Sequence, residues 1–358
     1  MNRKLFAGPR WQVAARWVAV GVGAAVLLLA PHSRLHAVVR GVRSRRFPRP
    51  TSHQPFIPDL PIHIHERPGS PADIPRRFLV EEANACLRAG GDVEVVAYVH
   101  SAISRVEQRR QTRLTWASAD TPKMVVVFMV GRAKTSVEHS ILLKESSRYH
   151  DIVQGDYGDH YNLLSYKALS SLYWVTRNCA HVPWTLHADD DILVDTFMLQ
   201  RFIHGLKDSS ERNALHCRKM DEEVQRKGKW RVSRYELPAS RYPPYCQGAM
   251  WLLPTAQIPK LLKASASINF LWVDDAYITG LLAAHANISI HDVGDQIDNT
   301  ILTSADVGSR LAWVHLRLLQ RSQEWPRVLA HHHGPTTSAQ PLAGTPPLPL
   351  MRKSLATF

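Results

Sequence analysis

The stretch Pro183-Trp184-Thr185-Leu186-His187-Ala188-Asp189-Asp190-Asp191 joins a short apolar segment directly to three aspartates. We expect residues 183–187 to form a buried strand, because a short apolar run behind a proline is typical of one. Three adjacent carboxylates repel one another and are costly beside a core unless a cation neutralises them. The pattern therefore predicts a functional site at the carboxyl end of this strand.

The segments around this stretch predict an α/β domain. Residues 123–131, Lys-Met-Val-Val-Val-Phe-Met-Val-Gly, are almost continuously apolar and indicate a strand buried on both faces. Apolar spacing and turn residues predict one further strand at 151–154 and helices at 74–107, 136–149 and 161–178. Strands that alternate with helices indicate a mostly parallel central sheet, whose ligands gather at the carboxyl ends of the strands.

The net charge of the chain is concentrated at its N-terminus. The 358 residues carry a formal charge of +13, from 44 Lys and Arg against 31 Asp and Glu. Residues 1–50 hold ten of the basic side chains and no acidic one, which leaves 34 basic against 31 acidic residues in the remainder. A nucleic-acid-binding protein needs basic residues interleaved with aromatic ones on its folded domain. We therefore expect no nucleic-acid partner.

The composition divides the chain into five segments. Residues 13–30 are apolar apart from Arg16 and span roughly 27 Å as a helix, close to the thickness of a thin bilayer. Pro31 opposes signal cleavage after Ala30, so we expect an uncleaved anchor, with a cleaved signal peptide and a buried core helix as alternatives. The expected segments are a cytoplasmic tail (1–12), a transmembrane signal anchor (13–30), a Pro- and Arg-rich stem (31–75), the main domain (76–330) and a disordered tail (331–358).

The aspartate run has two interpretations. Asp191 or Asp195 is suited to cap the helix that residues 196–203 predict. One cap does not require three acids, however, and carboxylate oxygens suit a hard divalent ion that neutralises the diphosphate of a nucleotide. We therefore expect metal and diphosphate binding at Asp189, Asp190 and Asp191, and capping is compatible with it.

A second acidic pair, Asp274-Asp275, follows an aromatic and proline segment, Tyr242-Pro-Pro-Tyr-Cys-Gln-Gly248. This segment is either a plain turn into a strand or a pocket wall, where aromatic surfaces pack against the C–H groups of a sugar. The acidic pair is placed to cap a helix over residues 276–286. A carboxylate at a helix N-terminus is also well held to act as a general base.

Four motifs in order resemble the β-1,3-glycosyltransferase family that includes the β-1,3-galactosyltransferases and β-1,3-N-acetylglucosaminyltransferases (glycosyltransferase family 31). The resemblance covers roughly residues 95–330. The motifs are the arginine-rich segment 109–116, the aspartate-rich segment 149–167, the segment from Cys179 to the aspartate run, and the segment 242–248 together with Asp274-Asp275-Ala276-Tyr277. Asp274 departs from the usual Glu and Ala276 from the usual Val.

The resemblance implies a single-pass type II Golgi membrane protein with a lumenal, GT-A-like domain that binds a nucleotide sugar. Such an enzyme uses a UDP-sugar and Mn²⁺ and inverts the anomeric carbon on transfer to a glycan acceptor of a glycoprotein or glycolipid. The donor sugar, galactose or an N-acetylhexosamine, stays open. So does the alternative of a membrane-anchored homologue that has lost catalysis and acts as a binding or assembly partner.

The resemblance also implies roles for single residues. Asp189 and Asp191 would ligate Mn²⁺ together with His315, for which His291 is the alternative. Asp190 would join them in holding the nucleotide sugar, and Asp275 would be the base that deprotonates the acceptor hydroxyl. Two arginines would face the nucleotide or diphosphate, or else pair with surface acids: Arg109 and Arg113.

The cysteines and one sequon bear on the compartment. Cys86, Cys179, Cys217 and Cys246 include no CxxC pair, which argues against a zinc knuckle. In a lumenal domain they permit two disulfides in three possible pairings. The tripeptide Asn287-Ile288-Ser289 would then be a glycan acceptor.

Overall fold

The computed structural model describes residues 70–298 and 307–333. Within these two ranges no helix is both long and apolar enough to cross a bilayer. The expected cytoplasmic tail, the anchor and nearly all of the stem lie outside the described residues, as does most of the expected C-terminal tail.

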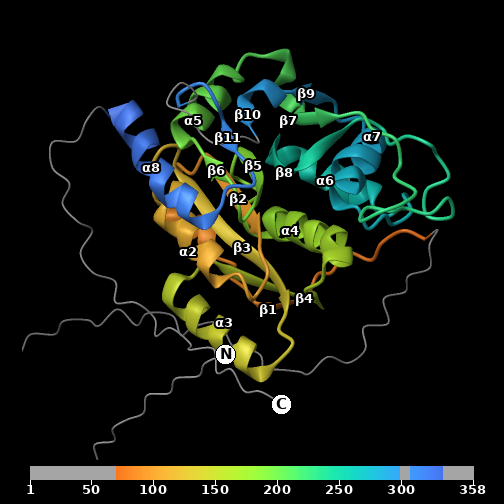
Figure 1. Ribbon diagram of the computed structural model, residues 1–358, viewed down its shortest axis with the longest axis horizontal. Coiled ribbons are helices and arrows are strands. Elements are labelled where there is room, and N and C mark those ends of the chain that lie inside the picture. Colours follow the sequence, from red (N-terminus) through yellow and green to blue (C-terminus); the bar gives the residue numbers. More distant parts are fainter. Residues whose placement is uncertain (1–69, 299–306, 334–358) are drawn as a thin grey trace, which may run out of the picture. The chain divides into compact units, whose positions relative to one another are not determined.

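A mixed sheet of eight strands forms the centre of the domain, in the order β1-β4-β3-β2-β5-β8-β7-β9 (Figure 1). Strands β4, β3, β2 and β5 are mutually parallel, whereas β1 and β8 join this block antiparallel. The α/β class is confirmed, and the expected parallel arrangement holds for the four middle strands. The strands are β1 (Phe78–Val80), β2 (Val95–His100), β3 (Met124–Arg132), β4 (Ile152–Gly158), β5 (Trp184–Asp189), β7 (Leu215–Met220), β8 (Tyr245–Pro254) and β9 (Ile290–Asp292).

Helices cover both faces of this sheet. Helix α4 packs with α6 over one face, and α3, α5 and α8 contribute to the core on the other. The helices are α1 (Ala85–Ala89), α2 (Val106–Leu114), α3 (Ser136–Tyr149), α4 (Leu164–Asn178), α5 (Thr196–Gly205), α6 (Ile258–Ala264), α7 (Ala283–His285) and α8 (Leu318–His333). A π-helix, Ala276–Leu282, leads directly into α7.

Local capping explains where two of the predicted helices begin. Helix α3 has the expected bounds, because the Thr135 hydroxyl accepts the Glu138 N–H at 3.2 Å and His150 ends the helix in a left-handed conformation, with φ 53°. Helix α5 is capped by Asp195, whose carboxylate accepts the Met198 N–H at 3.1 Å. The cap is therefore separate from the aspartate run.

The expected helix over residues 74–107 is wrong. This segment contains strand β1, the single turn of α1 and strand β2. Every residue of β2 is buried, because Val96 and Tyr98 enter one core while Val95 and Val99 enter the other. A strand buried on both faces has no alternation of apolar and polar residues, so nothing in its pattern separated it from a buried helix.

A second, three-stranded sheet in the order β10-β11-β6 joins distant parts of the chain. Strand β6 (Leu193–Val194) begins just behind Asp191, and β11 (Ala312–Trp313) ends just before His315. Strand β10 (Ile297–Asp298) pairs with the other edge of β11. Backbone pairing therefore brings His315 next to the aspartate run from more than a hundred residues away.

The two disulfides and the C-terminal helix complete the fold. Cys86 pairs with Cys179, and Cys217 on β7 pairs with Cys246 on β8, which selects one of the three possible pairings. Helix α8 continues to His333, past the expected boundary at 330. The physical reason is His332, whose buried Nε2 lies 2.9 Å from Asp195 Oδ2 and whose ring stacks on a phenylalanine of α5.

Candidate active site

A pocket of about 590 Å³ lies where the carboxyl end of β5 meets the first residues of β8. Asp189, Asp191 and His315 line one end of it, and Asp274 and Asp275 line another part of the same wall. The structure thus brings together five of the residues that the sequence singled out. Their shared pocket is the candidate active site.

The end formed by Asp189 and Asp191 is suited to a cation. Among the residues described, Asp191 Oδ1 is buried and has no hydrogen-bond partner. The Leu316 N–H donates to the Asp191 backbone carbonyl at 3.0 Å, which holds the chain at His315 next to the aspartate run, and His315 lines the same pocket as Asp189 and Asp191. His315 itself has φ 59°, a left-handed conformation that is uncommon for residues other than glycine and is often found at functional sites. A carboxylate oxygen without a partner and an imidazole that line one pocket are ligand types that suit a divalent ion.

The electrostatic environment of Asp189 also favours a bound cation. Desolvation at the base of the pocket raises the pKa of Asp189 well above its ordinary value, and the charges of Asp191 and Asp274 raise it further. Part of its side chain, 42%, is still exposed, so the carboxylate reaches the open pocket. Several negative groups this close together are stable in ionised form only with a positive charge between them.

Asp190 differs from its two neighbours and corrects the expectation that it holds the nucleotide. Its side chain is buried, accepts a hydrogen bond from Ser101 Oγ at 2.6 Å and accepts another from Arg105 Nε at 2.9 Å. Arg105 lines the pocket and lies 3.8 Å from Asp191 Oδ2. Asp190 therefore positions the guanidinium of Arg105 in the pocket near Asp191, and sequence reasoning missed Arg105 because no spacing distinguishes it from the other arginines nearby.

Arg109 and Arg113 do not line the pocket, which corrects the expectation that they face the nucleotide. Arg109 is completely buried and donates to Glu145 on α3 at 2.6 and 2.9 Å. Arg113 bonds the same glutamate at 2.8 Å and Asp151 at 2.7 Å. A buried guanidinium requires a carboxylate partner, and Glu145 supplies it inside the protein rather than at its surface.

The buried arginine acts on the pocket indirectly, through the loop at residues 101–103. Arg109 Nη2 donates to the Ile103 carbonyl at 3.1 Å, and Arg109 Nη1 donates to Ser101 Oγ at 3.2 Å. From the other side, Lys167 Nζ donates to the Ser101 carbonyl at 2.6 Å and to Asp159 at 2.7 Å. This loop carries the Ser101 hydroxyl that donates to Asp190. Arg109 of the arginine-rich segment and Lys167 of the aspartate-rich segment therefore support the acidic end of the pocket through this loop.

Asp275 stands at the start of the π-helix. Its carboxylate accepts the Ala276 N–H at 2.7 Å, so the expected capping role and a place in the pocket coexist. Burial raises the pKa of Asp275 to about 6, although hydrogen bonds from the backbone, including that of Gly248, act in the opposite direction. For the adjacent Asp274, burial and the charge of Asp275 raise the pKa as well. A carboxylate with a raised pKa is a stronger base than an ordinary one.

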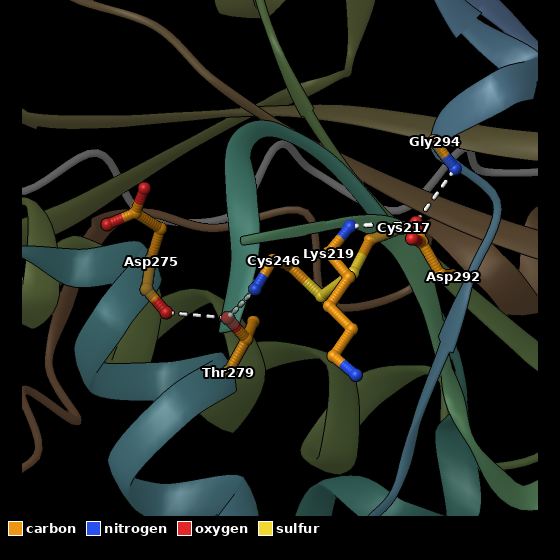
Figure 2. The surroundings of a disulfide bond; sticks show 7 residues. All are labelled: Cys217, Lys219, Cys246, Asp275, Thr279, Asp292 and Gly294. Carbon is orange, nitrogen blue, oxygen red and sulfur yellow. Dashed lines mark hydrogen bonds between the residues drawn. A yellow bond between two sulfur atoms is a disulfide. The ribbon is translucent and has the colours of Figure 1, made fainter. Parts of the chain in front are cut away.

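Strand β8 holds this base in two ways. The Thr279 hydroxyl donates to the Asp275 carbonyl at 2.6 Å and accepts the Cys246 N–H at 2.8 Å, next to the Cys217–Cys246 disulfide (Figure 2). Gly248 faces the carboxylate itself, since a Cβ at this position would lie 3.1 Å from Asp275 Oδ2. The missing side chain therefore leaves the room that the base occupies.

The remaining candidate ligands divide between two places. His291 on β9 pairs with Glu211 at 3.0 Å and does not line the pocket, whereas His315 lines it together with Asp189 and Asp191. His100 and His187 lie behind Asp189, with one ligand atom of each residue within 4.8 Å of the others. Burial lowers the pKa of His187 to about 3 and keeps its ring neutral. Within the described residues, these three are the His, Cys, Asp or Glu side chains whose ligand atoms come this close together, whereas Asp191 and His315 share only the pocket with Asp189.

Comparisons with known proteins identify the family. A family model described as Galactosyltransferase matches residues 107–294. The chain is 27% identical over 207 residues to "Beta-1,3-galactosyltransferase 5" of Pan paniscus, which covers 56% of this chain and 68% of that protein. It is also 27% identical over 234 residues to "Beta-1,3-galactosyltransferase 2" of Mus musculus, which covers 62% of this chain and 54% of that protein.

Among solved structures, the bifunctional glycosyltransferase WbbM aligns with 68% of this chain and 52% of its own at 8% identity and a TM-score of 0.38, too remote a likeness for further conclusions. The family model, by contrast, extends from α2 through the aspartate run to the π-helix that Asp275 caps. The chain therefore belongs to the galactosyltransferase family and is a β-1,3-galactosyltransferase-like glycosyltransferase.

Proposed function

We propose that this protein transfers galactose from a UDP-sugar, in β-1,3 linkage and with inversion, to a hydroxyl of a glycan acceptor. The observation that carries the proposal is one pocket in which a cation-binding end (Asp189, Asp191, His315) and a separate carboxylate with a raised pKa (Asp275) face the same space. An inverting displacement needs charge stabilisation on the leaving group and a base at the acceptor. The names of the similar proteins favour galactose over an N-acetylhexosamine, and the mixed sheet supports a GT-A-like fold.

Mn²⁺ fits the acidic end. Two carboxylates and one imidazole are ligands that this ion accepts, and the unpartnered Asp191 Oδ1 is available to it. When bound, the ion neutralises the charge that develops on the diphosphate leaving group. Arg105 adds a fixed positive charge at the same end, and Asp190 prevents that arginine from closing over the open carboxylates.

The residues of the chain perform the rest of the reaction. Asp275 accepts the proton of the attacking hydroxyl, and its raised pKa makes this transfer more favourable. Gly248 leaves its Oδ2 accessible, and Thr279 keeps its backbone against β8. Because the base is held by a helix start and a strand together, it needs little reorganisation when the acceptor arrives.

The substitution Asp275→Asn tests the assignment of the base. It keeps the shape of the side chain and the cap on Ala276 but cannot take a proton, so we expect transfer to be abolished while Mn²⁺-dependent UDP binding survives. Transfer is measured with radiolabelled UDP-galactose and binding by calorimetry. The matched control is Asp208→Asn, an exposed aspartate outside the pocket, which should leave both unchanged. Transfer retained by Asp275→Asn would remove this residue from the mechanism.

The runner-up function is a homologue that binds its partners without catalysis. It predicts UDP binding without release of UDP from UDP-galactose, in the presence of Mn²⁺ and any acceptor. The pocket favours the enzyme, because both the cation-binding end and the base are complete in it. A UDP-release assay on the full-length protein decides between the two functions.

We also infer that the domain is lumenal, in a Golgi membrane protein anchored by residues 13–30. Support comes from the two disulfides, since such bonds persist in oxidising compartments and are rare in the cytosol. Asn287 of the sequon is exposed at the end of α7, where a glycan has room. An endoglycosidase should shift the mobility of the protein made in eukaryotic cells, and Asn287→Gln should remove that shift.

A further inference from the structure

The connection between β7 and β8 is strongly basic, although the chain beyond residue 50 is nearly neutral. Residues 225–234 contain five basic side chains and no acidic one. We call this segment the basic arm; it belongs to the loop that extends past α6 and α7 (Figure 1). Its basic residues are Arg226, Lys227, Lys229, Arg231 and Arg234. The near-neutral total charge of the domain conceals this local excess of positive charge.

The basic arm is a built structure. Val224 and Val232 are buried at its base, 4% and 0% exposed, and the Val232 N–H donates to the Gln225 carbonyl at 2.8 Å. Arg226 Nη1 donates to the Val232 carbonyl at 3.0 Å and so holds the two sides of the arm together. The chain reverses at Gly228, with φ 82°. The other four cations are exposed, and none forms an ion pair with an acidic residue in the described part of the chain: Lys227, Lys229, Arg231 and Arg234.

The tip of the basic arm joins an aromatic rim at the mouth of the pocket. Trp230 Nε1 donates to Tyr161 Oη at 2.8 Å, and the ring of Tyr161 meets that of Trp272 edge-on, 6.2 Å between centroids. Lys229 Nζ lies 4.6 Å from the Tyr161 ring and 5.0 Å from the Trp230 ring. All four residues line the pocket, and Trp272 lies just upstream of the base.

This rim is open to a ligand. Tyr161 and Trp230 are 46% and 44% exposed, although each ring is held in place by the contacts above. Rings fixed in this way present a flat apolar surface beside Asp275, and the C–H face of a pyranose stacks on such a surface. The cations of the basic arm flank Trp230 in the sequence, and Lys229 lines the pocket with it. A ligand that uses both must have a sugar ring and negative charge.

We propose that the basic arm and the aromatic rim bind an acidic glycan acceptor, one whose sugars carry carboxylate or sulfate groups. This rests on the proposed transfer and names its acceptor class. The sugar that receives galactose stacks on the rim with its hydroxyl toward Asp275, and the anionic groups of the neighbouring sugars meet Lys227, Arg231 and Arg234. Glu222, which lines the pocket at the foot of the arm, keeps those anions outside the reaction centre.

A membrane surface fits these observations less well. The exposed rings of Tyr161 and Trp230 are engaged with each other and face the pocket, whereas a lipid-binding loop presents apolar side chains outward. A nucleic acid would have to pass the carboxylates of Asp274 and Asp275 to use the same rings. An acidic glycan needs only one uncharged hydroxyl to reach them.

The test uses the full-length protein and two acceptor probes, a β-linked galactosyl disaccharide and the same disaccharide carrying one sulfate. The variant is Lys227→Gln/Arg231→Gln/Arg234→Gln, and the matched control is Lys260→Gln/Lys263→Gln on α6. We expect the triple variant to raise the KM for the sulfated acceptor by about fivefold to twentyfold, the scale of one to two exposed ion pairs, and to leave the KM for UDP-galactose unchanged. High salt should likewise raise the KM of the unsubstituted protein for the sulfated acceptor. Trp230→Ala should raise the KM for both acceptors, and Trp230→Phe should restore most of the loss.

Four outcomes would overturn the proposal. The first is an equal KM for the two acceptors in the parent protein, and the second is an equal change for both in the triple variant. The third is binding of the arm to vesicles of anionic lipid with no preference between the two sugars, which would assign it to a membrane surface. The fourth is tighter binding to a single-stranded oligonucleotide than to the sulfated sugar. Failure of the proposed function itself is separate, because it appears as absent transfer to either acceptor.

Discussion

The two ends of the pocket are built in opposite ways. At the cation-binding end, the carboxylates of Asp189 and Asp191 are held from behind by Asp190, Arg105 and the loop that Arg109 braces, all of them in or near the core. At the mouth, Tyr161, Trp230 and the basic arm are exposed and touch mainly one another. The comparison teaches that the proposed cation site rests on buried ion pairs, whereas the proposed acceptor surface is exposed, where substitutions cost little stability.

The largest effect is expected at the open carboxylate of the cation-binding end. Asp191→Ala should remove Mn²⁺-dependent UDP binding and lower kcat/KM by roughly a hundredfold or more, because several kcal/mol of charge stabilisation are lost. Calorimetry with UDP and Mn²⁺ measures the binding. Asp292→Ala, an aspartate outside the pocket, is the control. Unchanged binding in Asp191→Ala would mean that the pocket end is not a cation site.

The buried Arg109 should contribute more to the stability of the domain than to nucleotide binding. Arg109→Ala leaves Glu145 with Arg113 alone and removes the hydrogen bonds to Ser101 Oγ and the Ile103 carbonyl, and breaking a buried ion pair costs about 3–5 kcal/mol of unfolding free energy. Denaturant unfolding measures it. Arg110→Ala removes an exposed arginine paired within the same helix and should cost at most about 0.5 kcal/mol. Weakened UDP binding with unchanged stability would restore the expectation that Arg109 faces the nucleotide.

The base predicts the direction of the pH profile. Asp275 works as a base when it is ionised, and its raised pKa moves loss of activity upward from the acid range of an ordinary aspartate, about 3.9. We expect kcat/KM to fall tenfold per pH unit once the pH drops below about 6. UDP binding measured at each pH separates this effect from protonation of the cation ligands. A profile that stays flat down to about pH 4 would contradict the raised pKa.

The smallest effect is expected at the hydroxyl that connects the base to β8. Thr279→Val keeps the volume but leaves the Cys246 N–H unpaired, which costs about 1–3 kcal/mol in local order. We expect kcat to fall about tenfold with little change in the KM for UDP-galactose. Thr279→Ser retains the hydroxyl and should recover the rate. If the Ser and Val variants behave alike, Thr279 has only a packing role.

Much of the scaffold was predictable because its signals are local. Strand β3 lies between proline and glycine signals, and α3 begins at its capping residue, so both appear at the expected places. Strand β2 was not predicted, because its side chains enter two cores and its sequence shows no alternation of apolar and polar residues. The apolar pattern of this segment fits a helix as well as a strand. Only the sheet pairing distinguishes the two, because Val95 to His100 pair with β3 on one side and with β5 on the other.

The site was predictable in its acidic residues and not in its basic ones. Runs such as Asp189–Asp191 and Asp274–Asp275 are unusual enough in sequence to need a cation or a reaction to explain them. Arginines are common near any surface, and spacing cannot tell Arg105 in the pocket from Arg109 in the core. What separates them is the position of Glu145, which α3 supplies from elsewhere in the chain.

The sequence alone therefore determined the fold class, the family and the acidic residues that line the pocket, because strand burial and clustered carboxylates leave marks over a few neighbouring residues. Tertiary structure decided which aspartate of the run points inward and which arginine reaches the pocket. It also decided that His315 lines the same pocket as Asp191 and that the basic arm contacts an aromatic rim. These contacts join segments far apart in the chain, and their partners depend on which strands pair and which faces pack.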